Sequence, residues 1–298
     1  MTNHAPFGRA PNADEARARH VATYELFIRP GDFDWLVSRW MHIVGLWPLL
    51  AWHRAQATEK YLKAILLLNT AEIPRSGHNS PQLWAVAETI LAEHDHGIDF
   101  SAPPAVGGVW TEECFDKWLS RMNERGNPDS RYGLLASGVE PDDFFKTDVA
   151  LAQLRRYTVD LSLPVGVAWP PRNDEEQKYS GRPFSDFLRS DRNANVRPLP
   201  EFQGSYPIVG VESVNDLLRN WNVALTPNEL APATAPAAIA SSGFRNPYIG
   251  WGLVLQAEAS CEYKSAEAKA IAEWLIGTNA LSSGAVEFLK SITRIKTK

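Results

Sequence analysis

The chain has 298 residues, of which 44% are hydrophobic and 22% charged, and its formal net charge is −5. This length suits two domains with real cores. Residues 1–163 carry 16 basic and 21 acidic side chains and the rest carries 14 of each, so neither half resembles a protein that coats nucleic acid through its phosphates.

Other compositional features exclude further classes. The two cysteines lie far apart, which argues against a disulfide framework and a structural zinc site. No secretory signal pattern and no stretch long enough to span a bilayer is present, so we expect a cytoplasmic protein without membrane contact. Seven of the eleven tryptophans lie in the first 120 residues. They favour an aromatic core, with a stacking platform for bases as the alternative.

The first half of the chain reads as a series of helices. We expect one over 14–27, ending before Pro30, and a second that begins at Asp32 or Asp34 and reaches Ile43. Pro48 suits the first turn of a third helix, which runs to about residue 68. One side of this third helix is apolar and consists of Ala51, Ala55, Thr58, Tyr61, Leu62, Ile65 and Leu66.

Further helices follow after turn signals. Ser80 suits a helix cap with Pro81 in the first turn, a shorter helix covers 112–122, and Asp142 or Asp143 begins a helix that reaches Tyr157. We therefore expect an antiparallel helical bundle over residues 14–163.

The second half, 164–298, is rich in proline and looks like an accessory region. The expected fold class is mainly α: a helical bundle followed by an irregular, α-rich C-terminal region with at most a small β hairpin. The elements expected there are a strand over 208–211, a hairpin over 244–255, and helices over 213–220, 265–276 and 282–295.

The third helix carries a recognisable motif. The segment Trp52 to Ala64 reads WHRAQATEKYLKA, and Gly77-His78-Asn79 follows after an aliphatic run. It resembles the central signature of the HEPN family, in which a helix of the form Q-A-x-E-K-x-L-K-A precedes an H-[DN]-[LS] turn. The acidic segment that begins at Asp32 is similar to the opening of the family's first core helix. The resemblance covers about residues 20–160 and implies a HEPN-like bundle.

What the resemblance implies is a role in nucleotide or RNA biology, commonly in toxin–antitoxin or defence systems. It also implies a homodimer formed through the bundle, with a nucleotidyltransferase, another protein or RNA as a further partner. Ribonucleases of the family carry an arginine followed after four to six residues by a histidine on the last core helix. Here that helix offers Arg155 and Arg156, and no histidine follows His96. We therefore expect a non-catalytic module for dimerisation or partner binding, with contact to nucleotide or RNA.

Three sets of side chains are candidates for a site. Arg54, Lys60 and Lys63 on the third helix could line a groove for phosphates, although a purely architectural role is the alternative. A ribonuclease with a non-standard active site would use His53, Arg54 or His78 together with Arg155 or Arg156.

The third set is the dense run 93–99, which offers His94, His96 and Asp99 to a metal ion and would serve a metal-dependent hydrolase. Helix ends and solvated loops often have this composition too. We expect no metal and no cofactor.

Overall fold

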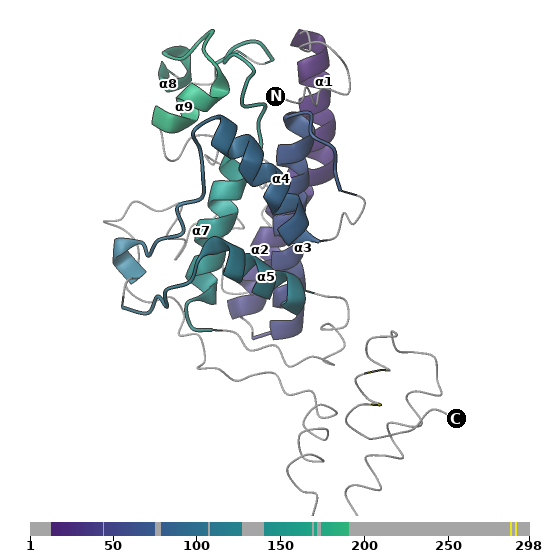
Figure 1. The fold of residues 1–298 in the computed structure, drawn as a ribbon, viewed down its shortest axis with the longest axis vertical. Coiled ribbons are helices and arrows are strands. Elements are labelled where there is room, and N and C mark those ends of the chain that lie inside the picture. Colours follow the sequence, from purple (N-terminus) through teal and green to yellow (C-terminus); the bar gives the residue numbers. More distant parts are fainter. Residues whose placement is uncertain are drawn as a thin grey trace, which may run out of the picture.

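A computed structural model gives the arrangement of the chain, which is mainly helical (Figure 1). This confirms the predicted fold class. Among the residues that the structure describes there is no strand, and β pairing is confined to two isolated bridges, Pro164 with Pro183 and Val165 with Ser180. The described residues are 13–43, 45–74, 79–106, 108–126, 140–168, 170–171 and 174–190, together with Glu287 and Lys290.

The first helix is longer than predicted, because it continues through Pro30. It consists of α1 (Ala13–Thr23), a π-helical turn η1 (Tyr24–Ile28) and α2 (Arg29–Ile43) without a break. The predicted end before Pro30 was therefore wrong. Proline inside an α-helix clashes with the carbonyl four residues earlier. Here the wider π turn, in which the N–H of Arg29 bonds to the carbonyl of Tyr24, precedes the proline and accommodates its ring.

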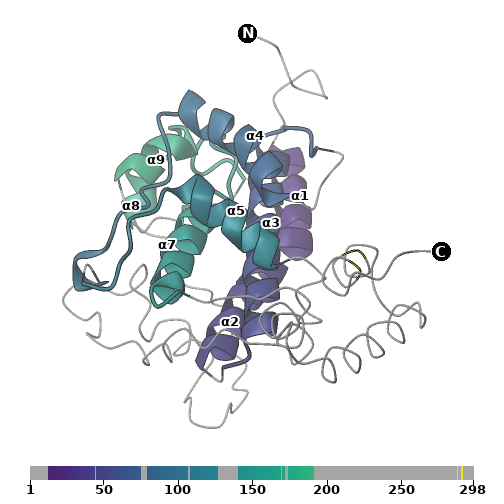
Figure 2. The same ribbon diagram turned by 60° about the horizontal axis from the view of Figure 1, so that its bottom comes forward.

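The third predicted helix, α3 (Trp47–Leu68), is the centre of the bundle (Figure 2). It packs on α1, η1 and α2 as well as on the later helices. Gly45, with a φ of 75°, makes the tight turn that precedes α3, and Pro48 lies in its first turn as predicted. The structure buries every member of the predicted apolar stripe: Ala51, Ala55, Thr58, Tyr61, Leu62, Ile65 and Leu66.

The next two helices, α4 (Ser80–Glu93) and α5 (Phe115–Arg125), pack on α3 and on each other. The cap of α4 is Asn79 rather than Ser80, because the side-chain oxygen of Asn79 accepts the Gln82 N–H at 3.2 Å. Helix α5 begins and ends three residues later than predicted, and Gly126 is its C-cap. A Cβ on Gly126 would lie only 2.1 Å from the Cβ of Ala55, so glycine is what allows α5 to approach α3 this closely.

The last described elements are a short 3₁₀ turn η2 (Pro104–Val106), α7 (Asp143–Arg156), α8 (Asp174–Gln177) and α9 (Phe184–Ser190). Helix α7 begins and ends where the sequence predicts. Figure 1 shows α8 and α9 at one end of the bundle. Val165, Phe187 and Leu188 belong to the same core as Tyr157 and Leu161. The core therefore continues past residue 163, and the domain boundary expected there stays a prediction.

The tryptophans of the first half serve mainly as core residues. Trp35, Trp84, Trp110 and Trp118 are buried, and the Trp35 and Trp118 side chains are completely so. This confirms the core interpretation for these four. None of the described helices has the length and apolar character that a bilayer crossing requires.

Several predictions fall outside the described residues. These are the strand over 208–211, the hairpin over 244–255, the helices over 213–220 and 265–276, and the candidate residue His78. Of the helix predicted over 282–295, only Glu287 and Lys290 are described, and both are helical.

Candidate functional site

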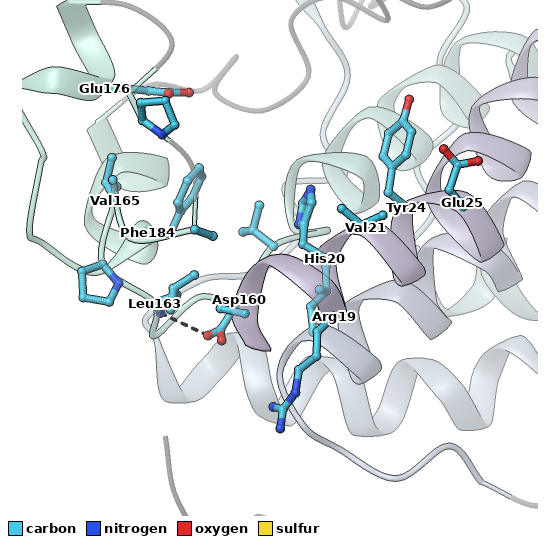
Figure 3. Close-up of a pocket in the computed structure, with 17 residues that line it drawn as sticks. Arg19, His20, Val21, Tyr24, Glu25, Asp160, Leu163, Val165, Glu176 and Phe184 are labelled. Atoms are coloured by element: carbon cyan, nitrogen blue, oxygen red, sulfur yellow. Dashed lines mark hydrogen bonds between the residues drawn. The ribbon is translucent and has the colours of Figure 1, made fainter. Parts of the chain in front are cut away.

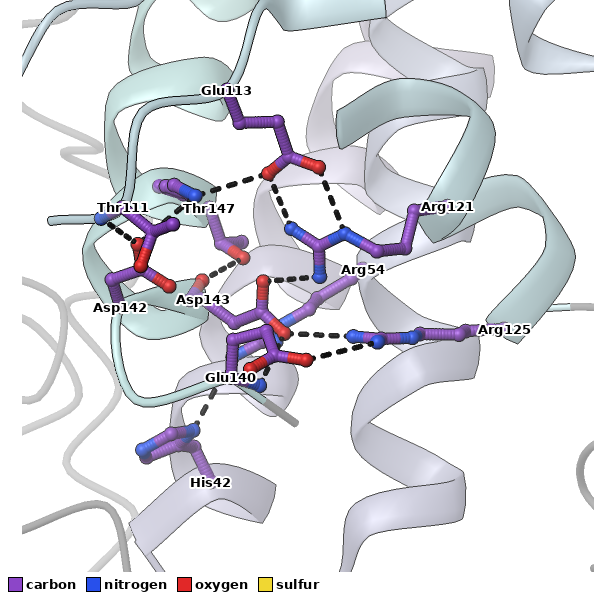
Figure 4. A network of polar contacts seen from close by, with 11 residues as sticks. His42, Arg54, Thr111, Glu113, Arg121, Arg125, Glu140, Asp142, Asp143 and Thr147 are labelled. Carbon is purple, nitrogen blue, oxygen red and sulfur yellow. Dashed lines mark hydrogen bonds and ion pairs between the residues drawn. The ribbon is translucent and has the colours of Figure 1, made fainter. Parts of the chain in front are cut away.

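A network of charged side chains lies where α2, α3, α5 and α7 meet (Figure 4). Asp142 and Asp143 stand at the start of α7, where the partial positive charge of a helix N-terminus favours acids. Both are fully buried. The Thr111 N–H donates to Asp142 Oδ2 at 2.6 Å, and the Glu140 N–H donates to Asp143 Oδ2 at 2.9 Å. The two carboxylates therefore anchor the chain before α7 as well as the helix itself.

Two arginines of α5 converge on Asp143. Arg121 Nη1 lies 2.6 Å from Asp143 Oδ1, and Arg125 Nη1 lies 2.9 Å from Asp143 Oδ2. Because they are four residues apart, the two arginines share one side of α5. Arg125 also lies 3.7 Å from Glu140. These contacts fasten α5 to the start of α7.

Glu113 extends the network before α5. Arg121 donates to it from Nε at 3.0 Å and from Nη2 at 2.6 Å, and Lys146 Nζ donates at 3.0 Å. Lys146 also lies 2.9 Å from Asp142. Burial alone would raise the pKa of Glu113, but the hydrogen bonds from Arg121 and Lys146 hold it below its usual value. The carboxylate is therefore ionised and fixed in place.

Arg54 of α3 lies beneath this layer and is 2% exposed. Its Nη2 lies 3.3 Å from His42 Nδ1, and its Nε has no hydrogen-bond partner among the described residues. Burial lowers the pKa of Arg54 to about 10, against the opposing effect of Asp143 and Asp148. Burial, Arg54 and Arg39 together lower the pKa of His42 to about 3, so this imidazole is neutral at pH 7.

A second buried pair continues the network across to α2. Arg39 forms an ion pair with Asp148 of α7, and both side chains are buried. Trp35 Nε1 donates to the other oxygen of Asp148 at 2.9 Å. The Arg39 guanidinium also stands 4.5 Å from the centre of the Phe144 ring. Burial raises the pKa of Asp148, although Arg39 and Trp35 act in the opposite direction.

The formal charges of the network balance. The cations are Arg39, Arg54, Arg121, Arg125 and Lys146, and the acids are Glu113, Glu140, Asp142, Asp143 and Asp148. Buried ion pairs of this kind lose much of their Coulomb gain to desolvation, but removing one partner leaves a buried charge without its counterion. The network thus sets the arrangement of four helices.

The three predicted phosphate-binding cations are all engaged within the chain. Arg54 belongs to the buried network, Lys60 binds Asp34 of α2, and Lys63 Nζ lies 2.6 Å from Glu59 Oε1. The lysine side chains are largely buried rather than left in water, with Lys63 14% exposed. Phosphate binding by these residues stays a prediction. A phosphate would have to compete with Asp34 for Lys60 and with Glu59 for Lys63.

Two of the candidates for a non-standard ribonuclease site, His53 and Arg155, contact carboxylates of α2. His53 Nδ1 is 2.8 Å from Asp34 Oδ1. Arg155 Nε donates to Asp32 Oδ1 at 2.8 Å, and that oxygen also accepts the Tyr61 hydroxyl at 2.6 Å. Burial would lower the pKa of Arg155, but Asp32 keeps it above its usual value.

The remaining candidates have other surroundings. The Arg156 guanidinium stands 5.5 Å from the centre of the Tyr157 ring. His96 Nε2 lies 3.1 Å from the Ser185 carbonyl, whereas His94 lies near the Ser162 hydroxyl and Asp99 accepts a hydrogen bond from Ser101. In the described part of the chain no three metal-ligating side chains gather.

Sequence reasoning missed the charged network itself. Its members come from five separate stretches between Arg39 and Asp148. The usable signals were the spacing of Arg121 and Arg125 and the paired acids Asp142 and Asp143, which we interpreted only as a helix start. Compared with models of protein families, with curated proteins and with solved structures, the chain matches none.

Proposed function

We propose that the described bundle is HEPN-like and acts as a non-catalytic assembly module whose first partner is a second copy of this chain. The observation that carries the proposal is a set of large apolar side chains on the outer sides of the first two long helices. Leu26 and Phe33 are 65% and 53% exposed on η1 and α2, and Leu49 and Leu67 are 41% and 36% exposed on α3.

These residues lie on two helical segments that pack against each other, because η1 and α2 both contact α3. Leu49 and Leu67 are eighteen residues apart, so they return to the same side of α3. Asp34 joins the two helices along this surface through His53 and Lys60. We call the surface formed by Leu26, Phe33, Leu49 and Leu67 the outer face. Exposed apolar patches of this kind are typical of interaction sites.

The ion pairs of α2 and α3 favour a protein over RNA as the partner. His53 and Lys60 share Asp34, and Lys63 is paired with Glu59. A phosphate would need to displace one of these carboxylates, whereas a second bundle could bury the apolar side chains and leave the ion pairs intact. The excess of acidic over basic side chains in residues 1–163 also opposes phosphate contacts.

The test is the oligomeric state of the full chain by sedimentation-velocity ultracentrifugation over a range of concentrations. We expect a dimer whose Kd rises at least tenfold in Phe33→Glu, because a carboxylate would be buried against an apolar partner. Val109→Glu is the matched control, because Val109 is similarly exposed, at 52%, and lies outside the outer face. A monomer at tens of micromolar, or equal weakening by Val109→Glu, would refute the proposal.

A parallel experiment tests whether the chain cleaves RNA. The full chain is incubated with total RNA in the absence of metal, beside His53→Ala and His78→Ala. We expect no cleavage that depends on either histidine. Cleavage that disappears in one of these variants would replace the assembly module with a ribonuclease.

A further inference from the structure

A pocket of about 410 Å³ lies between the first long helix and the segment 159–184 (Figure 3). His20, Val21 and Tyr24 stand on one side of it, and Val165 and Phe184 stand on the other. Its lining includes no member of the charged network. The volume is within the range of pockets that hold small molecules.

The walls of the pocket are mostly apolar and are held by the bundle. Leu68 of α3, together with Val159 and Val165, is buried in the surrounding structure. Arg17 Nε donates to the carbonyl of Ala168 at 2.9 Å, which ties α1 to the opposite wall. Because these walls are already fixed, the protein loses little conformational entropy when a ligand binds in the pocket.

Asp160 supplies the main polar feature. Its Oδ1 accepts the N–H groups of Ser162 and Leu163, each at 3.1 Å. Its Oδ2 accepts no hydrogen bond from the described residues, although the carboxylate lines the pocket. Burial raises the pKa of Asp160, while the charges of Arg19 and His94 act against this. A donor that reached Oδ2 would therefore stabilise an ionised group that is short of solvation.

The charged side chains that line the pocket are mostly acidic. Three carboxylates line it, those of Glu25, Asp160 and Glu176, against one permanent cation, Arg19. Glu25 is partly neutralised by Arg29, 3.1 Å away on the exposed side. Asp160 is therefore the carboxylate that a bound cation would meet.

We propose that this pocket binds a small, largely apolar molecule that carries a protonated amine. The ammonium group donates to Asp160 Oδ2, and the apolar body lies between Val21 and Phe184. Charge-assisted hydrogen bonds give specificity for the amine, and burial of the apolar body gives most of the affinity.

The experiment uses three probes that share a phenylethyl group on the full chain: phenethylamine, its neutral analogue ethylbenzene and its carboxylate analogue hydrocinnamate. Saturation-transfer NMR detects binding, and calorimetry measures the affinity of the amine. We expect phenethylamine to bind more tightly than either analogue. Asp160→Asn should weaken phenethylamine by roughly tenfold to a hundredfold and leave ethylbenzene unchanged, because only the charged hydrogen bond is lost.

Two further variants locate the binding. Val21→Trp should abolish binding of all three probes, because Val21 is exposed on the pocket wall and the indole fills the space. Asp99→Asn is the control, because this exposed acid lies outside the pocket, and it should change nothing. Circular dichroism checks that each variant folds. The proposal is overturned by no binding of phenethylamine, by equal binding to Asp160→Asn, by preference for hydrocinnamate, or by binding that survives Val21→Trp.

Discussion

Replacing Asp143 with alanine should destabilise the protein more than any exposed acid would. Asp143 is fully buried and accepts hydrogen bonds from Arg121, Arg125 and the Glu140 N–H. Removing one partner of a buried ion pair costs roughly 3–5 kcal/mol. Arg121 and Arg125 keep 20% and 18% exposure, so water can partly solvate them after the change. We therefore expect a loss at the lower end, about 3 kcal/mol, or a Tm lower by roughly 6–12 °C.

Urea unfolding of the full chain, followed by tryptophan fluorescence and far-UV circular dichroism, measures this loss. Asp186→Ala is the control, because Asp186 forms an exposed pair with Arg189 at 3.3 Å. Such surface pairs contribute less than about 1 kcal/mol. A double-mutant cycle with Arg125→Ala should give a coupling free energy above about 1 kcal/mol, since the two side chains touch. If Asp143→Ala costs no more than Asp186→Ala, the charged network does not hold α5 against α7.

Two further predictions concern packing and pH. Gly126→Ala should cost about 2 kcal/mol or more, because the new methyl would overlap Ala55, whereas Gly97→Ala, with open space around it, should change thermal stability by less than about 0.5 kcal/mol. His42, whose pKa is about 3 in the fold, should contribute stability above pH 6.5 that is lost as the pH falls toward 3, because only the unfolded chain takes up its proton. At pH 5 this loss is about 2 kcal/mol, from roughly 1.5 pH units at about 1.36 kcal/mol each, and His42→Gln should remove that part of the difference between urea titrations at pH 5 and pH 7.

The sequence predicted those features that depend on neighbours along the chain. The apolar stripe of α3 follows from helical spacing, and it is buried as expected. The start of α7 at Asp143 follows from the preference for acids at a helix N-terminus. The start of α4 differed by one residue, because Asn79 and Ser80 are both good caps and only the coordinates show which side chain turns back to the backbone.

The features that were missed depend on distant contacts or on an unusual backbone. Arg54 looks like a surface cation in the sequence, yet it lies inside the bundle because Asp143 and Asp148 arrive from α7 to face it. No local sequence pattern indicates a contact between such distant residues. The break predicted at Pro30 failed for another reason, since a π turn relieves the clash on which the rule is based.

That π turn also sets the directions in which the side chains at the two ends of the first helix point. It contains one residue more than an α-helical turn, and one residue corresponds to a rotation of about 100°. Ahead of it, His20 and Val21 line the pocket, and beyond it, Trp35 and Arg39 contact Asp148. Deleting a single residue from 24–28 would remove the turn that accommodates Pro30 and would rotate the two ends of the helix relative to their surroundings. The chain could then retain the pocket wall or the ion pair, but not both.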